Sequence, residues 1–123
     1  MILEKKTAII GASLNPERYA FLASQMLFEN HYAVVPLGIK SGKTAGIEIV
    51  TDWPSSIPDL HTVTLYIGPK HQPEHYPYIL GLKPKRIIFN PGTENPELSA
   101  LATIQGIEVV EACTLVMLRT EQY

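Results

Sequence analysis

Short apolar and β-branched runs alternate along the chain with segments whose apolar residues recur at helical spacing. The runs cover residues 7–11, 32–37, 62–67, 86–90 and 107–110. The helical segments cover about 16–30, 71–82, 95–105 and 113–118. This alternation is typical of a parallel sheet covered by helices. The pattern therefore predicts a three-layer α/β protein with a five-stranded, mostly parallel sheet and helices on both faces.

Local signals mark several of the predicted boundaries. Asn95 followed by Pro96 predicts a helix N-cap and the first helical residue. Gly106 suits the left-handed position that ends the same helix. Pro77 lies inside the segment 71–82 and lacks a backbone donor, so we expect that helix to begin late or to kink.

The remaining segments are less regular. Residues 38–53 include three glycines and two lysines, and we expect only a short extended piece at 47–50. Residues 121–123 follow the last predicted helix, and we expect them to fray. The sequence shows no repeat, low-complexity tract or linker, and 123 residues is an ordinary length for one domain. We therefore expect a single domain over residues 1–123.

The charge balance narrows the choice of partners. Ten Lys and Arg residues stand against 12 Asp and Glu residues, which gives a formal net charge of −2. Such a chain lacks the electrostatic signature of a nucleic-acid-binding or membrane-surface protein. It also has no run of about 18 apolar residues and no cysteine besides Cys113, and we expect no secretory signal. We expect a cytoplasmic protein without a nucleic-acid or membrane partner, in which an anionic ligand is bound by local features.

The ends of the predicted strands are the candidate binding site, because ligands of open parallel sheets lie outside the carboxyl ends of the strands. Those ends consist of small residues and prolines: Gly11-Ala12-Ser13, Pro36-Leu37-Gly38, Gly68-Pro69, Asn90-Pro91-Gly92 and Ala112-Cys113. One such loop is ordinary turn chemistry. Several at one edge indicate a crevice in which a ligand approaches the main chain.

The loop of residues 11–18 has the outline of a phosphate site, since it joins a buried strand to the start of a helix. Gly11 permits a tight turn, and Ser13 and Asn15 offer side-chain hydrogen bonds. Arg18 offers a planar pair of donors to phosphate oxygens.

A cation at Arg18 opposes the helix dipole by a few tenths to about 1 kcal/mol, and a bound anion would reverse that cost. The alternative is that Arg18 is solvated or paired with Glu17 or Glu94.

A free ribose diol is a poor match for this sequence. The loop departs from the dinucleotide pattern GxGxxG at Ser13 and Pro16. The end of the second strand lacks the acidic residue that holds a ribose 2′-hydroxyl. Lys40 and Lys43 follow instead, and they suit a phosphorylated ribose, although Lys43 is equally well explained as a solvated loop residue.

Other chemistry finds little support. Residues 38–44 end like a P-loop but are one residue too short. His71 and His75 are four residues apart, yet no third ligand matches them, so we expect no metal site. Cys113 is most simply a packing residue. No nucleophile–base set or carboxylate pair appears at a useful spacing, so the sequence argues for binding rather than catalysis.

Five segments together resemble a known family, the small bacterial CoA-binding proteins. They are GASLNPERY, VVPLG, VTLYIGP, IIFNPGTENPEL and EACTLVMLRT, which follow or include most of the predicted strands. These proteins have a Rossmann-like fold similar to the CoA-binding domain of succinyl-CoA synthetase. Nothing in the sequence corresponds to the phosphorylated histidine of that enzyme, so the resemblance implies binding without catalysis.

The resemblance implies that coenzyme A or an acyl-CoA lies across the carboxyl ends of the strands. The residues implied to bind it are Gly11, Ala12, Ser13, Asn15 and Arg18 near phosphate, Leu37, Gly38 and Lys40 near the adenosine, Ile67, Gly68 and Pro69 on the opposite side, and Asn90 and Gly92 near the pantetheine. The sequence departs from commoner members at residues 37–39, where many have Val-Asn-Pro.

Two functions remain open at this point. The first is a CoA carrier, sensor or accessory protein that forms a homodimer or joins an enzyme partner. The second is a small NAD(P)-dependent oxidoreductase or redox-sensing protein. The missing acidic residue favours the first.

Overall fold

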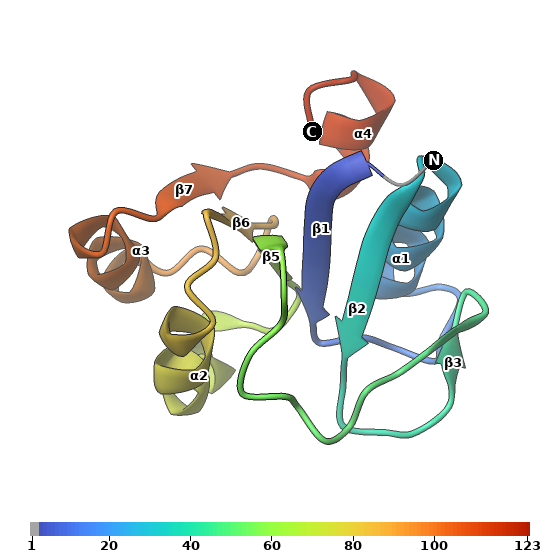
Figure 1. Ribbon diagram of the computed structural model, residues 1–123, viewed down its shortest axis with the longest axis horizontal. Helices are drawn as coiled ribbons and strands as arrows, with labels where there is room; N and C mark the ends of the chain where they lie inside the picture. The colour runs from blue at the N-terminus through green and yellow to red at the C-terminus, as the bar shows by residue number, and fades with distance from the viewer. Residues whose placement is uncertain (1–2) are drawn as a thin grey trace.

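The computed structural model describes residues 3–123 and contains one five-stranded parallel sheet (Figure 1). Its strand order is β2-β1-β5-β6-β7. The bounds of these strands are β1 Leu3–Ile10, β2 Tyr32–Leu37, β5 Leu60–Leu65, β6 Arg86–Phe89 and β7 Glu108–Glu111. The strand order reverses between β1 and β5, which is the place where ligands of such sheets bind.

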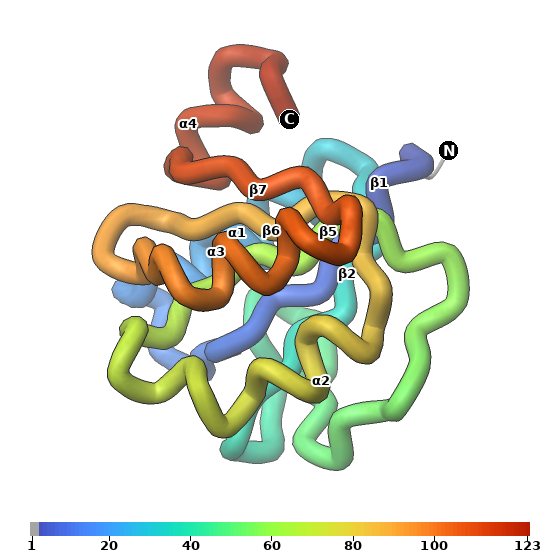
Figure 2. The backbone as a smooth tube through the Cα atoms, turned by 90° about the vertical axis from the view of Figure 1, so that its left-hand side faces the viewer, coloured from blue at the N-terminus to red at the C-terminus, as the bar shows by residue number. Residues whose placement is uncertain are grey.

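Helices cover both faces of the sheet. Their bounds are α1 Tyr19–Glu29, α2 Tyr76–Gly81, α3 Pro96–Ile104 and α4 Thr114–Arg119. Helices α2 and α3 pack on one face, and Figure 2 shows them in front of the strands. Helices α1 and α4 pack on the other face. The structure therefore confirms the predicted three-layer, Rossmann-like α/β fold.

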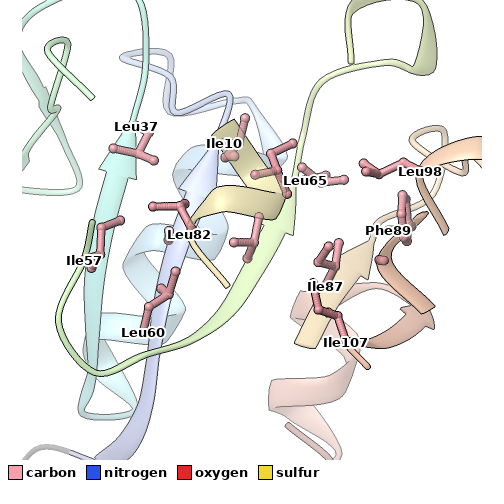
Figure 3. Packing of buried hydrophobic residues seen from close by; sticks show 14 residues of the cluster. Ile10, Leu37, Ile57, Leu60, Leu65, Leu82, Ile87, Phe89, Leu98 and Ile107 are labelled. Carbon is pink, nitrogen blue, oxygen red and sulfur yellow. The ribbon is translucent and has the colours of Figure 1, made fainter. Parts of the chain in front are cut away.

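The core divides into two apolar clusters because the central strands are buried on both faces. On β1, Ile9 and Ile10 point to opposite sides of the sheet, and both are fully buried. Ile10 lies beside Leu65 of β5 in the parallel register and faces α2 and α3 (Figure 3). Ile9 packs against Leu27 of α1. A continuous apolar run such as β1 thus supplies both layers at once.

Local sequence signals set several boundaries as predicted. Strand β2 has the predicted bounds. Helix α2 begins late, at Tyr76, with Pro77 in its first turn, after the two short 3-10 helices Pro69–His71 and Pro73–His75. The Oδ1 atom of Asn95 caps α3, and Gly106 has the expected positive φ of 78°.

Two segments that join the strands differ from the prediction. Helix α1 begins three residues later than 16, because Asn15 folds residues 15–18 into a turn by accepting a hydrogen bond from the Glu17 amide at 2.9 Å. The irregular stretch after β2 forms a small hairpin of β3 (Lys43–Thr44) and β4 (Ile47–Glu48). The sequence pattern predicted only the second of these strands.

The expectation that residues 121–123 fray is wrong. Tyr123 is 5% exposed, and its main-chain oxygen accepts hydrogen bonds from the Lys5 ammonium and from Arg86 Nη1. The Arg86 guanidinium also lies 4.4 Å from the centre of the Tyr123 ring. These partners are remote in the sequence, so the local sequence pattern could not predict these contacts.

Candidate functional site

A cleft of about 680 Å³ opens at the carboxyl ends of the strands, among the loops that follow β1, β2, β5 and β6. Most of the residues predicted to bind a ligand line this cleft. They are Gly11, Ala12, Ser13, Asn15, Arg18, Gly38, Lys40, Ile67, Gly68 and Gly92. The parallel topology brings together loops that lie far apart in the chain, from the loop after β1 to the loop after β6.

Two of the predicted phosphate donors are already engaged. The amides of Gly11 and Ala12 donate to the main-chain oxygen of Leu37 at 3.1 and 3.0 Å. Gly11 has a φ of 99°, which favours glycine, and a Cβ there would lie 3.0 Å from the Ile67 side chain. The start of the loop therefore shapes the cleft, and its amides are not free to bind phosphate.

The middle of this loop and the start of α1 remain open to a ligand. Within the described residues, the amides of Ser13, Leu14, Tyr19 and Ala20 have no hydrogen-bond acceptor, and the first turn of α1 carries no acidic side chain. Arg18 is exposed beside them and forms no ion pair with any residue from 3 to 123. Its expected alternative partner Glu94 instead accepts a hydrogen bond from the Gly92 amide at 2.8 Å. An unpaired cation at a helix start favours an anionic ligand.

The loop after β2 supplies the second cation. Lys40 is exposed and lines the cleft, whereas Lys43 lies on β3 and does not line it. Gly38 is tightly enclosed, because a Cβ there would lie 2.9 Å from Ile49 and 3.0 Å from the main-chain oxygen of Ala12. No aspartate or glutamate side chain lines the cleft in the part of the chain that the structure describes.

Trp53 and His75 form an aromatic wall on the side of the cleft that faces α2. Trp53 Nε1 donates to the main-chain oxygen of Gly38 at 3.0 Å. The Trp53 ring centre lies 5.0 Å from that of His75 and 5.3 Å from that of Tyr78. Sequence reasoning missed this wall, because Trp53 lies in the least regular stretch and His75 was weighed only as a metal ligand. The signal available was that Trp53 is the chain's one tryptophan.

A buried amide, Gln72, ties together the loops after β5 and β6. Its Nε2 donates to the main-chain oxygens of Ile67 at 3.0 Å and Thr93 at 2.8 Å. Its Oε1 accepts a hydrogen bond from Asn95 Nδ2 at 2.9 Å. Ile67 and Thr93 both line the cleft, so Gln72 fixes the distance between two of its walls.

Three predicted binding residues do not line the cleft: Leu37, Pro69 and Asn90. Leu37 is fully buried, and only its main-chain oxygen reaches the loop after β1. Asn90 is also buried, and its side chain is engaged within the protein. Its Nδ2 donates to Thr64 Oγ1 at 2.6 Å, and its Oδ1 accepts from the Thr114 amide at 2.9 Å. Asn90 therefore joins β5, β6 and α4 and does not line the cleft.

Tyr66 also lines the cleft and was not predicted. Its hydroxyl is buried and has no hydrogen-bond partner within residues 3–123. Burial raises the pKa of Tyr66 above its ordinary value, because the phenolate would be poorly solvated.

His71 and His75 do not share an α-helical face. They lie in two consecutive 3-10 helices, and only His75 reaches the cleft. In the described part of the chain, no group of three or more His, Cys, Asp or Glu residues could hold a metal ion. Cys113 is half-buried and packs beside the cluster that contains α1 and α4. None of the helices described is long and apolar enough to cross a membrane.

Comparison with known proteins assigns this chain to a family. A family model described as a CoA binding domain matches residues 5–119. The search of curated proteins gives no match.

Solved structures with similar folds include three other proteins. An uncharacterised protein is 48% identical with a TM-score of 0.93, and the alignment covers 97% of this chain and 98% of that one. A hypothetical protein from Pyrococcus horikoshii is 30% identical with a TM-score of 0.83, covering 94% and 82% of the two chains. A protein from Thermus thermophilus is 26% identical with a TM-score of 0.81, covering 97% and 90%.

Proposed function

The chain belongs to the CoA-binding domain family, and on this premise we propose that its cleft holds coenzyme A or an acyl-CoA. The phosphates lie over β1 and β2, near Arg18 and Lys40. The pantetheine arm runs over β5 and β6, past Gly68 and Gly92. We propose that the protein acts as a carrier, sensor or accessory protein.

The charge of the cleft carries this proposal. The whole chain has a net charge of −2, yet the charged side chains that line the cleft in the described structure are Arg18 and Lys40. Two cations without a neighbouring carboxylate form a local positive field, which attracts a polyanion. The free amides of Tyr19 and Ala20 add donors at the same place.

The reach of the cleft also fits a long ligand. It crosses the ends of β2, β1, β5 and β6, which are adjacent in the sheet. Three strand spacings of about 4.8 Å give roughly 14 Å. A mononucleotide would cover only the half that carries the cations, whereas a nucleotide with an extended arm covers both halves. The half over β5 and β6 is lined by uncharged residues such as Ile67 and Pro91, which suits an uncharged arm.

A nicotinamide dinucleotide is the competing ligand. Lys40 should favour NADP, which carries a phosphate on its ribose, over NAD, which does not. The loop that follows β2 presents Ile39 and Lys40 to the cleft and no carboxylate for a free ribose diol. NAD should therefore bind poorly. NADP has a phosphorylated ribose, as CoA does, so it should compete with CoA more strongly than NAD.

Isothermal titration with CoA, acetyl-CoA, NAD and NADP tests the proposal. We expect the two CoA compounds to bind at least tenfold more tightly than NAD, and more tightly than NADP. Arg18→Gln should weaken CoA binding about fivefold or more, since it removes a charge-assisted phosphate contact. Arg119→Gln is the matched control, because Arg119 is exposed on α4 away from the cleft. Tighter binding of NAD or NADP than of CoA would overturn the proposal.

A further inference from the structure

We infer that His75 and Lys40 together bind the phosphate on the ribose of the ligand, and that Trp53 holds the two loops that carry them in position. This inference rests on the proposed function and extends it, because it names the part of the ligand that gives specificity. A CoA-type nucleotide with a phosphorylated ribose is then preferred over the same nucleotide with a free diol.

Trp53 links the two loops directly. Its Nε1 donates to the main-chain oxygen of Gly38, two residues before Lys40. Its ring packs on the ring of His75, which lies beyond β5. All three side chains line the cleft together. Lys40 and His75 therefore line the cleft on either side of Trp53's contacts, although they lie far apart in the sequence.

Trp53 itself is a support and not a stacking platform for the base. Its ring is already flanked by His75 at 5.0 Å and Tyr78 at 5.3 Å. The loop that carries Trp53 is fixed further by Tyr78, whose hydroxyl donates to the main-chain oxygen of Pro54 at 2.7 Å. An indole held by two rings and a hydrogen bond is preorganised, which fixes the position of the groups that it touches.

The imidazole of His75 is available to a ligand. The side chain is 28% exposed, and neither ring nitrogen forms a hydrogen bond within residues 3–123. Glu74 lies beside it, with Oε1 3.7 Å from His75 Nε2, and Glu74 is 71% exposed. Such an exposed carboxylate is screened by water and competes weakly for the imidazole.

The two groups are complementary in chemistry. Lys40 offers a mobile ammonium with three donors, and His75 offers a fixed ring donor on a preorganised wall. A phosphate accepts hydrogen bonds from both at once, because its oxygens point in different directions. A ribose hydroxyl cannot make use of the ammonium charge. The pair therefore discriminates by the presence of the phosphate.

The test compares binding of CoA and of 3′-dephospho-CoA, with Trp53 fluorescence and isothermal titration as readouts. The wild-type protein should prefer CoA at least tenfold. His75→Phe keeps a ring against Trp53 and removes the nitrogens, and Lys40→Met keeps the length of the side chain and removes the charge. Each should lower the preference threefold or more, and His75→Phe should in addition leave the affinity for 3′-dephospho-CoA within twofold of wild type.

The chain offers matched controls for both substitutions. His71→Phe and Lys43→Met change residues of the same types that are close in the sequence and lie outside the cleft lining, so the preference should be unchanged. An unchanged preference in His75→Phe, or an equal loss for both ligands, would overturn the inference and leave the proposed function intact. Failure of the wild-type protein to bind either ligand would instead refute the proposed function.

Discussion

Replacing Gln72 by leucine should destabilise the protein by about 2–4 kcal/mol. Gln72 is fully buried, and its amide forms three hydrogen bonds to groups on two cleft loops. Leucine fills a similar volume but strands the buried main-chain oxygen of Thr93, at a cost of about 1–3 kcal/mol. Ile67 is half-buried, and Asn95 keeps a second bond to the Tyr76 hydroxyl at 2.7 Å, so these groups add a smaller penalty.

Urea denaturation followed by circular dichroism measures this effect through the midpoint at constant m-value. For a chain of this length the loss corresponds to a fall in Tm of roughly 4 °C per kcal/mol. Gln105→Leu is the matched control, because Gln105 is exposed at the end of α3 and should change stability by less than about 0.5 kcal/mol. A Gln72→Leu protein as stable as this control would refute the role assigned to the buried network.

Two other substitutions test the shape and the electrostatics of the cleft. Gly38→Ala places a methyl group 2.9 Å from Ile49 and 3.0 Å from the Ala12 oxygen. It should therefore lower the free energy of unfolding by about 1–3 kcal/mol and weaken CoA binding. Unchanged stability would show that the two loops move apart easily. Tyr66→Phe removes an unpartnered hydroxyl, so stability at neutral pH should stay equal or rise by about 1 kcal/mol. Because burial raises the pKa of Tyr66 in the folded state, wild-type stability should fall as the pH rises above 10.0, its ordinary value. The Phe variant should fall less steeply, and parallel pH curves for the two proteins would contradict this assignment.

The parts of the fold that the sequence predicted are those set by local physics. Strand β2 is bounded by its own apolar run, and α3 begins where the Asn95 side chain meets the amides of Glu97 and Leu98 at 3.1 and 3.2 Å. Most cleft residues were predictable for a topological reason, since parallel strands place their carboxyl ends at one edge. Gly11 and Gly92 reach the cleft on that ground alone.

The missed features depend on partners far along the chain. Gln72 appears in the sequence as an ordinary polar residue, and its role exists only because Ile67 and Thr93 lie on either side of it. Asn90 illustrates the opposite case. An amide at the end of a strand resembles a ligand-binding group, yet its hydrogen bonds to Thr64 and Thr114 hold the layers together. A sequence pattern places a residue at an edge but does not show whether its polar atoms are already satisfied.

The hydrogen bonds that the amides of the loop after β1 form within the protein determine how a phosphate can be bound. Gly11 and Ala12 donate to Leu37, so the first two amides of the turn are not available to a phosphate. The amides of Ser13 and Leu14, and those of Tyr19 and Ala20 at the start of α1, have no acceptor within the described residues. Recognition then combines these amides with the side-chain charges of Arg18 and Lys40. Affinity for CoA should accordingly fall steeply as ionic strength rises, because an exposed arginine and lysine are screened by salt.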